Sequence, residues 1–156
     1  MCSSDLVALA AQGIQPARYD VLVVAQKVVS KVEGRIVALA EVTPSARATH
    51  LAQETGKDPR LVELILSECT GVVRARRDVL IVRHRLGYVM ANAGVDQSNL
   101  DTPGTALLLP LDPDASAARL RARLEERFGT APGVIVRSEE HTSELQSPCN
   151  LVCRLL

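Results

Sequence analysis

The chain has 156 residues, of which 47% are hydrophobic, and its 18 basic and 18 acidic residues give a formal net charge of zero. This size and composition predict one globular domain with a buried core. The balanced charge and the scarcity of aromatic side chains argue against nucleic acid and anionic membranes as partners. No stretch approaches the roughly 20 apolar residues of a membrane span, and the N-terminus has no secretion signal, so we expect a cytoplasmic protein.

Both ends of the chain resemble the translation of a DNA sequencing-library adapter. The codons AGA TCG GAA GAG CAC encode Arg137 to His141, and their reverse complement, in another frame, encodes Cys-Ser-Ser-Asp-Leu, which stands at residues 2–6. One DNA word on opposite strands thus accounts for both ends. We therefore expect residues 1–6 and 137–156 to be adapter-derived and residues 7–136 to be a partial genuine domain.

The first predicted elements surround an apolar run over Val21–Ala25. Residues 7–13 are expected to be the end of a helix. The apolar run is typical of a buried strand. A segment over residues 26–34 follows and ends at a glycine, and a second apolar stretch covers residues 35–40.

Proline and capping residues then mark two helices. Thr43 is the predicted N-cap of a helix with Pro44 in its first position, which runs to about Thr55 and ends at Gly56. A second helix begins at Asp58-Pro59. The apolar face predicted for this helix comprises Leu61, Val62, Leu64, Ile65 and Leu66.

Short strands are predicted at residues 72–73, 79–82 and 88–90, with a turn over 85–87, and residues 107–109 form a brief apolar segment. Asp112 and Pro113 begin a last amphipathic helix, which extends through Phe128 and ends at Gly129. A strand over residues 133–136 follows. Strands and helices mixed in this order indicate an α+β or α/β domain.

The loop over residues 91–99 gathers side chains that carry oxygen. They are Asn92, Asp96, Gln97, Ser98 and Asn99. Gly94 allows the backbone to turn, or to approach a ligand where a Cβ would clash. Asp96 is the natural ligand for a hard cation, and a single carboxylate is typical of magnesium or manganese held partly by substrate phosphates. An ordinary turn is the alternative, because Asn and Asp are common turn formers.

A basic segment directly follows the first strand and contains Gln26, Lys27 and Lys31. Ligands of α/β sheets tend to bind beyond the carboxyl ends of strands, so two lysines and a glutamine at this place suit a polyphosphate. The glycine spacing of a Walker loop is missing. A solvated lysine face explains the same residues equally well.

The remaining polar residues have simpler interpretations. We expect Cys69 to be a small buried thiol, His50 and His84 to lie at the surface, and Asp112 to cap its helix. Five arginines cluster around two predicted strands, where they either meet an anionic substrate or are solvated at strand edges. They are Arg74, Arg76, Arg77, Arg83 and Arg85.

Four motifs of the chain belong together. They are Val-Val-Ser-Lys-Val-Glu-Gly-Arg at 28–35, Ala-Asn-Ala-Gly-Val-Asp-Gln-Ser-Asn at 91–99, Leu-Leu-Leu-Pro-Leu-Asp-Pro-Asp-Ala-Ser-Ala at 107–117 and Gly-Val-Ile-Val at 133–136. In this order and spacing they resemble the coenzyme F420-0:L-glutamate ligase family. The resemblance covers essentially all of residues 7–136. It implies an α+β fold, a homodimer, and an enzyme that joins L-glutamate to the lactyl carboxylate of coenzyme F420-0 at the expense of GTP. Further γ-linked glutamates can follow.

By this resemblance, Gln26, Lys27, Lys31 and Asn99 occupy nucleotide-contacting positions and Asp96 a position that binds Mn²⁺ or Mg²⁺; no catalytic residue is assigned. The family's N-terminal nucleotide loop, its acidic and hydroxyl pair after Val136 and its C-terminal half are missing, so we expect this polypeptide alone to be inactive. Two alternatives remain: a non-catalytic module that binds nucleotide or metal, and a purely structural fragment.

Overall fold

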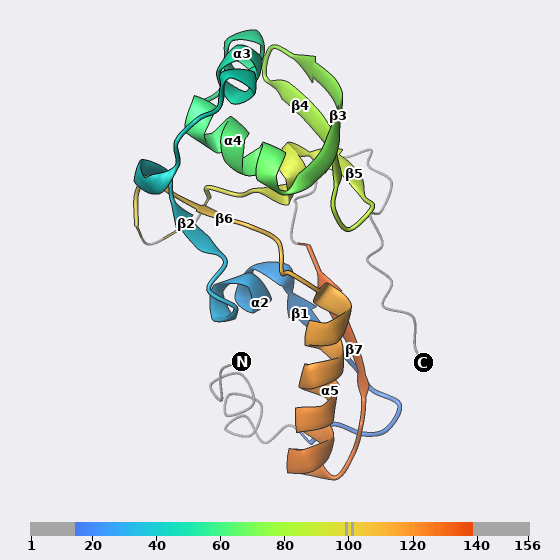
Figure 1. Cartoon of the computed structure of the whole chain (residues 1–156). Helices are drawn as coiled ribbons and strands as arrows, with labels where there is room; N and C mark the ends of the chain where they lie inside the picture. The colour runs from blue at the N-terminus through green and yellow to red at the C-terminus, as the bar shows by residue number, and fades with distance from the viewer. Residues whose placement is uncertain (1–14, 99, 101, 139–156) are drawn as a thin grey trace. The chain divides into compact units, whose positions relative to one another are not determined.

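The computed structural model describes residues 15–98, 100 and 102–138 (Figure 1). They belong to two compact units. The first unit comprises the chain up to Gly34 together with the part from Pro110 onward, and the second unit is Arg35–Leu109. Both contain helices and strands, so the predicted α+β class is confirmed. The predicted helix end at residues 7–13, and the segments 1–6 and 139–156 of the predicted adapter-derived ends, lie outside the described residues.

The first unit is built on a parallel pair of strands, β1 (Val21–Ala25) and β7 (Gly133–Arg137). Helix α2 (Gln26–Val32) follows β1 directly, and helix α5 (Pro113–Phe128) precedes β7. Apolar side chains from all four elements form one core cluster. Its buried members are Val29, Ala117, Leu120, Leu124, Val134 and Val136.

Local sequence signals account for the ends of α5. The side chain of Asp112 accepts a hydrogen bond from the backbone N–H of Ala115 at 2.9 Å, as expected of an N-cap, and Pro113 occupies the first turn. Gly129 ends the helix in the left-handed conformation, with φ of 70°. The predicted cap, helix and stop are therefore confirmed, as is the strand that follows.

The prediction that β1 is a buried strand is wrong for one of its faces. Leu22 and Val24 pack against the core, but Val21 and Val23 are 54% and 55% exposed. Successive side chains of a strand point to opposite faces, and the buried residues of α2 and α5 join the core on the Leu22 and Val24 side. The apolar run therefore has one covered face among the described residues.

The second unit contains two small antiparallel sheets. In the first, β2 (Ile36–Ala38) pairs with β6 (Thr105–Leu107). In the second, the strand order is β3 (Cys69–Arg76), β4 (Val79–His84) and β5 (Val89–Ala91). Helices α3 (Ala46–Thr55) and α4 (Pro59–Ser67) pack on this sheet, and the short 3-10 turns η1 (Leu39–Glu41) and η2 (Asn92–Gly94) complete the unit. The main core cluster comprises Ala48, Ala52, Val62, Ile65, Leu80, Val82 and Ala93.

The start of α3 differs from the prediction. Ser45 rather than Thr43 is the N-cap, and its Oγ accepts a hydrogen bond from the N–H of Ala48 at 3.2 Å. Glu63 of α4 explains the shift, because its carboxylate accepts hydrogen bonds from both the N–H and the Oγ of Ser45, at 2.8 Å and 2.6 Å. The predicted end at Gly56 is confirmed.

The other predicted elements of the second unit are present. Asp58 caps α4 by accepting a hydrogen bond from the N–H of Arg60, and residues 85–87 form the turn before β5. Strand β3 is longer than the two residues predicted, because it pairs with β4 along its length. Within the described ranges, no helix is both long enough and apolar enough to cross a bilayer.

Candidate functional site

Helix α2 carries three of the predicted nucleotide-binding residues. Gln26 is its first residue and is 7% exposed, and its Nε2 donates a hydrogen bond to Ser30 Oγ at 2.6 Å. Lys27 is half-buried and Lys31 is exposed. Residues four apart lie on the same side of a helix, so α2 brings the two lysines together. The structure thus groups the three residues in the first unit.

The loop that precedes Asp96 has an unusual backbone. Asn92, Ala93 and Gly94 follow one another with positive φ angles of 51°, 53° and 66°. A Cβ on Gly94 would come within 3.0 Å of the Leu109 side chain. Glycine therefore suits position 94 for two reasons, its tolerance of a positive φ and its lack of a side chain, as the sequence predicts.

Asp96 is held in place by backbone hydrogen bonds to β6. Its N–H donates to the carbonyl of Leu107 at 3.0 Å, and its carbonyl accepts from the N–H of Leu107 at 2.7 Å. The carboxylate Oδ1 accepts hydrogen bonds from the N–H and the Oγ of Ser98, at 2.8 Å and 2.7 Å. These hydrogen bonds form an ordinary Asx turn, which the sequence analysis gave as the alternative to a metal-binding loop. They also fix the orientation of the Asp96 carboxylate.

A cation at Asp96 would need ligands from outside this loop. No group of three or more His, Cys, Asp or Glu side chains that could hold a metal is found in the described part of the chain. One oriented carboxylate fits a hard divalent cation when phosphate oxygens and water complete the coordination shell. Asn99 lies outside the described residues. Asp96 belongs to the second unit, and its role as a metal ligand stays a prediction.

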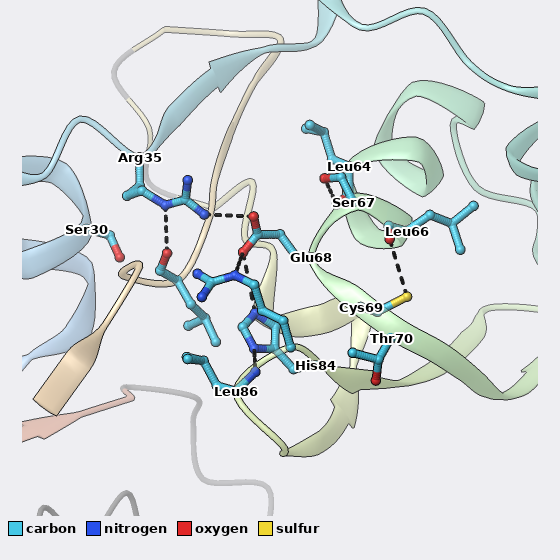
Figure 2. Close-up of polar contacts among 12 residues, drawn as sticks. Ser30, Arg35, Leu64, Leu66, Ser67, Glu68, Cys69, Thr70, His84 and Leu86 are labelled. Atoms are coloured by element: carbon cyan, nitrogen blue, oxygen red, sulfur yellow. Dashed lines mark hydrogen bonds and ion pairs between the residues drawn. The ribbon is translucent and has the colours of Figure 1, made fainter.

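The second unit also contains a buried charged cluster that the sequence did not indicate. Its four members are Arg35, Glu68, His84 and Arg85, and we call them the Glu68 cluster (Figure 2). Arg35 donates to Glu68 Oε1 at 2.8 Å, and Arg85 donates to Glu68 Oε2 at 3.1 Å. His84 Nε2 lies 3.5 Å from Glu68 Oε2, longer than a close hydrogen bond.

The cluster connects the two ends of the second unit. Arg35 is the first residue of that unit, and its Nε donates to the carbonyl of Leu109, the last residue, at 2.9 Å. The carbonyl of Arg35 accepts from the N–H of Leu108 at 3.0 Å. Glu68 follows α4 directly, and its carbonyl accepts from the N–H of Arg85. The charged residues therefore join the end of α4, the turn after β4 and both ends of the second unit through hydrogen bonds and ion pairs.

The charge state of Glu68 follows from these contacts. Burial alone would raise the pKa of its carboxyl group, but the adjacent His84 imidazole and the hydrogen bond from Arg35 stabilise the carboxylate. The positive charges of Arg35 and Arg85 act in the same direction, so the pKa falls to about 2. Glu68 is therefore ionised at neutral pH, with its oxygens occupied by structural partners.

The prediction that His84 lies at the surface is wrong. His84 is fully buried, and its Nδ1 accepts a hydrogen bond from the N–H of Leu86 at 3.1 Å. Its alternation with Leu80 and Val82, both buried, could have revealed this position. His50 is exposed, as predicted. Cys69, predicted to be a small buried thiol, is half-buried, and this burial raises the pKa of its thiol, which disfavours the reactive thiolate.

The arginine group divides into two parts. Arg85 pairs with Glu68 and is half-buried, whereas the other four members are exposed. These four are Arg74, Arg76, Arg77 and Arg83. The structure thus places four of the five arginines where they can meet solvent or an anion.

Known proteins match the chain over nearly all of its length. The profile of the F420-0:Gamma-glutamyl ligase family matches residues 3–150. The coenzyme F420:L-glutamate ligase of Methanopyrus kandleri is 49% identical over 132 residues, which are 85% of this chain and 52% of that protein. The corresponding protein of Methanothermobacter thermautotrophicus is 45% identical over 117 residues, 75% of this chain and 46% of that protein.

A third relative gives the same result. The coenzyme F420:L-glutamate ligase of Archaeoglobus fulgidus is 42% identical over 132 residues, again 85% of this chain and 52% of the relative. The chain spans about half the length of the curated relatives that it matches. Because the family profile covers almost the entire sequence, the chain belongs to the F420-0:Gamma-glutamyl ligase family.

Proposed function

We propose that this chain is part of an enzyme that joins L-glutamate to the lactyl carboxylate of coenzyme F420-0, with GTP as the energy source, and that adds further glutamates by γ-linkage. The family match over residues 3–150 carries this proposal. The names of the similar archaeal proteins supply the coenzyme and the amino acid. A homodimer and a cytoplasmic location belong to the same proposal.

The roles of the α2 residues follow from their charge and placement. Lys27 and Lys31 lie four positions apart in α2, so their ammonium groups can neutralise the phosphates of one GTP molecule. Gln26 starts the same helix, where its hydrogen bond to Ser30 gives the amide group a fixed orientation. Together they would bind and orient the triphosphate.

Asp96 and the neighbouring Asn99 would supply the metal ligand and a further nucleotide contact. The hydrogen bonds from Ser98 orient the Asp96 carboxylate, which would hold Mn²⁺ or Mg²⁺. A divalent cation bound there supplies charge neutralisation for phosphoryl transfer. Asn99 would contribute an amide contact to the nucleotide.

The proposed reaction has two steps. An oxygen of the lactyl carboxylate attacks the γ-phosphorus of GTP, the bond to the β,γ-bridging oxygen breaks, and GDP leaves. The amine of glutamate then attacks the carbon of the acyl phosphate, the carbon–oxygen bond breaks, and inorganic phosphate leaves. The proton lost by the amine passes to solvent. One oxygen of the original carboxylate therefore ends in the phosphate.

This oxygen transfer gives the decisive experiment. The Methanopyrus relative is incubated with GTP, glutamate, Mn²⁺ and coenzyme F420-0 labelled with ¹⁸O in its carboxylate. We expect one labelled oxygen in each phosphate and equal amounts of GDP and glutamylated product. Unlabelled phosphate would overturn the acyl phosphate. GTP binding without GDP formation would instead establish the non-catalytic module.

The assigned residues are tested in the 156-residue chain by titration with GTP and Mn²⁺. Lys31→Gln is expected to weaken GTP binding about tenfold, because it removes one charge-assisted hydrogen bond. Asp96→Asn is expected to abolish the dependence of binding on Mn²⁺. Lys57→Gln, the matched control outside α2, is expected to leave binding unchanged. Equal binding by all variants would overturn the assignments. We expect no turnover from this chain alone.

A further inference from the structure

The sheet β3–β4–β5 has one covered face and one outer face, and strand register shows which residues share each. Residues directly opposite in an antiparallel pair lie on the same face. The pairs Val72↔Val82 and Ala75↔Leu80 belong to the face that packs on the core. The alternate pairs Gly71↔Arg83, Arg74↔Ile81 and Arg76↔Val79 form the outer face. Figure 1 shows the β3–β4 hairpin in green.

Three arginines lie on this outer face, and we call Arg74, Arg76 and Arg83 the arginine row. All three are exposed. Arg74 and Arg76 are two residues apart on β3, and Arg83 lies diagonally across from Arg74 on β4. Successive members are therefore about 7 Å apart along the strands. The register thus places three neighbouring arginine positions on one face of the sheet.

Among the strand residues that the structure describes, the outer face has positive charge and no matching negative charge. The residues that pair with or follow the arginine row on this face are Gly71, Val79, Ile81, Val89 and Ala91. None is acidic. The nearest carboxylate along the chain, Asp78, lies in the hairpin turn and is 4.0 Å from Arg77. Solvated sheet faces commonly mix both signs of charge, so three arginines without an acidic neighbour among the described residues of this face make it suited to an anionic ligand.

The same face offers room and apolar surface between its charges. Val89, which pairs with Arg83, is 53% exposed. Gly71 lies opposite Arg83 on the other side, and a Cβ built there would meet no atom within 4 Å. A ligand that alternates carboxylates with methylene groups would therefore contact both the guanidinium groups and the apolar side chains.

We propose that the arginine row binds the γ-linked oligoglutamate chain of the product. This inference rests on the proposed function, since such a chain arises only if further glutamates are added by γ-linkage. Each γ-linked residue keeps a free α-carboxylate and places two methylene groups in the chain. Arginine suits this ligand better than lysine, because its planar guanidinium binds a carboxylate through two parallel hydrogen bonds.

The test compares two ligands of equal charge. γ-Linked and α-linked tetraglutamate each carry five carboxylates, and both are titrated into the 156-residue chain at low and moderate salt. In an extended α-linked chain, successive side chains point to opposite faces, so fewer carboxylates reach the row. We expect tighter binding of the γ-linked ligand, weakened by salt. Equal or tighter binding of the α-linked ligand would overturn the proposal.

Variants then locate the site. Arg74→Gln and Arg83→Gln are each expected to weaken γ-tetraglutamate binding about threefold, and the triple variant with Arg76→Gln more than about tenfold. Arg47→Gln on α3 removes the same charge from an exposed position outside the sheet and should change nothing. Circular dichroism monitors folding, and the single variants carry the test if the triple variant unfolds. Unchanged affinity in the arginine variants would overturn the site.

These titrations involve neither GTP nor turnover. An absence of tetraglutamate binding would therefore overturn the arginine row while the ¹⁸O experiment still supported the ligase reaction. Conversely, unlabelled phosphate in that experiment would count against the reaction and leave the binding data unaffected. The two failures are thus distinguishable.

Discussion

The two units of the chain each cover one face of a sheet with helices, but the outer faces differ. In the parallel pair β1–β7, the outer residues Val21, Val23 and Ile135 are apolar and exposed. In the antiparallel sheet β3–β4–β5, the outer face carries the arginine row. Antiparallel sheets commonly face water on one side, whereas parallel sheets are usually covered on both. The outer face of β1–β7 is therefore apolar and exposed, and exposed apolar surface favours association with another surface.

The units also differ in how they use charge. The first unit combines its apolar cluster with one ion pair, in which the side chain of Glu33 is 16% exposed and lies 2.9 Å from Arg119. The second unit adds the Glu68 cluster, in which one buried carboxylate is shared by two arginines. A buried carboxylate is tolerated only when it is paired and hydrogen-bonded, and removal of a partner is costly. Arg119 is 57% exposed, so the second unit should respond more strongly to changes in charge than the first.

The largest expected effect tests whether the core of the first unit is packed as tightly as the main core of the second unit. Leu124 in the first unit and Ile65 in the second are fully buried. Leu124→Ala and Ile65→Ala are each expected to lower the free energy of unfolding by about 3 kcal/mol, because each leaves a cavity. Urea denaturation measures both. The exposed Val23→Thr is the control and should change stability little.

A much smaller loss in Leu124→Ala than in Ile65→Ala would contradict equal packing. It would mean that the cluster around β1 and β7 collapses readily around the missing side chain. The two units would then differ in the packing of their cores as well as in their outer faces.

Glu68→Gln comes next in magnitude and tests the role of charge in the second unit. The substitution keeps the shape of the side chain but removes the negative charge that Arg35 and Arg85 share. We expect a loss of about 2 kcal/mol in unfolding free energy, less than for a fully buried pair because Arg85 is partly exposed. Glu63→Gln on α4, which keeps an acceptor for Ser45, should lose well under half of that.

Acid titration tests the role of the Glu68 charge through the pH dependence of the unfolding free energy. The pKa of Glu68 falls from 4.5 to about 2 in the folded chain, so as the pH decreases the unfolded state takes up the proton first. The stabilisation is complete above about pH 5 and is lost as the pH decreases toward 2. Stability should therefore fall more steeply with acid in the native sequence than in Glu68→Gln. Parallel curves would show that Glu68 has an ordinary pKa.

The predictions that succeeded depend on neighbours in sequence. Asp112, Pro113 and Gly129 specify α5 through contacts within a few residues, so its ends could be read directly. The failures depend on distant partners. His84 is buried beside Glu68, 16 positions earlier, and the exposed face of β1 depends on where α5 packs. The metal role of Asp96 stays a prediction, because a turn and a ligand site need the same residue types.

The smallest predicted effect concerns one helix start in each unit. Ser45→Ala in α3 and Asp112→Ala in α5 each remove an N-cap acceptor and should cost about 1 kcal/mol. Thr43→Ala is the matched control, because Thr43 precedes the cap in the structure and should change stability by less than about 0.5 kcal/mol. Thermal unfolding of the three variants measures the differences. If Thr43→Ala proved the more damaging of the two changes near α3, the helix would begin where local sequence alone placed it, and the hydrogen bonds from Ser45 to Glu63 would not set its start.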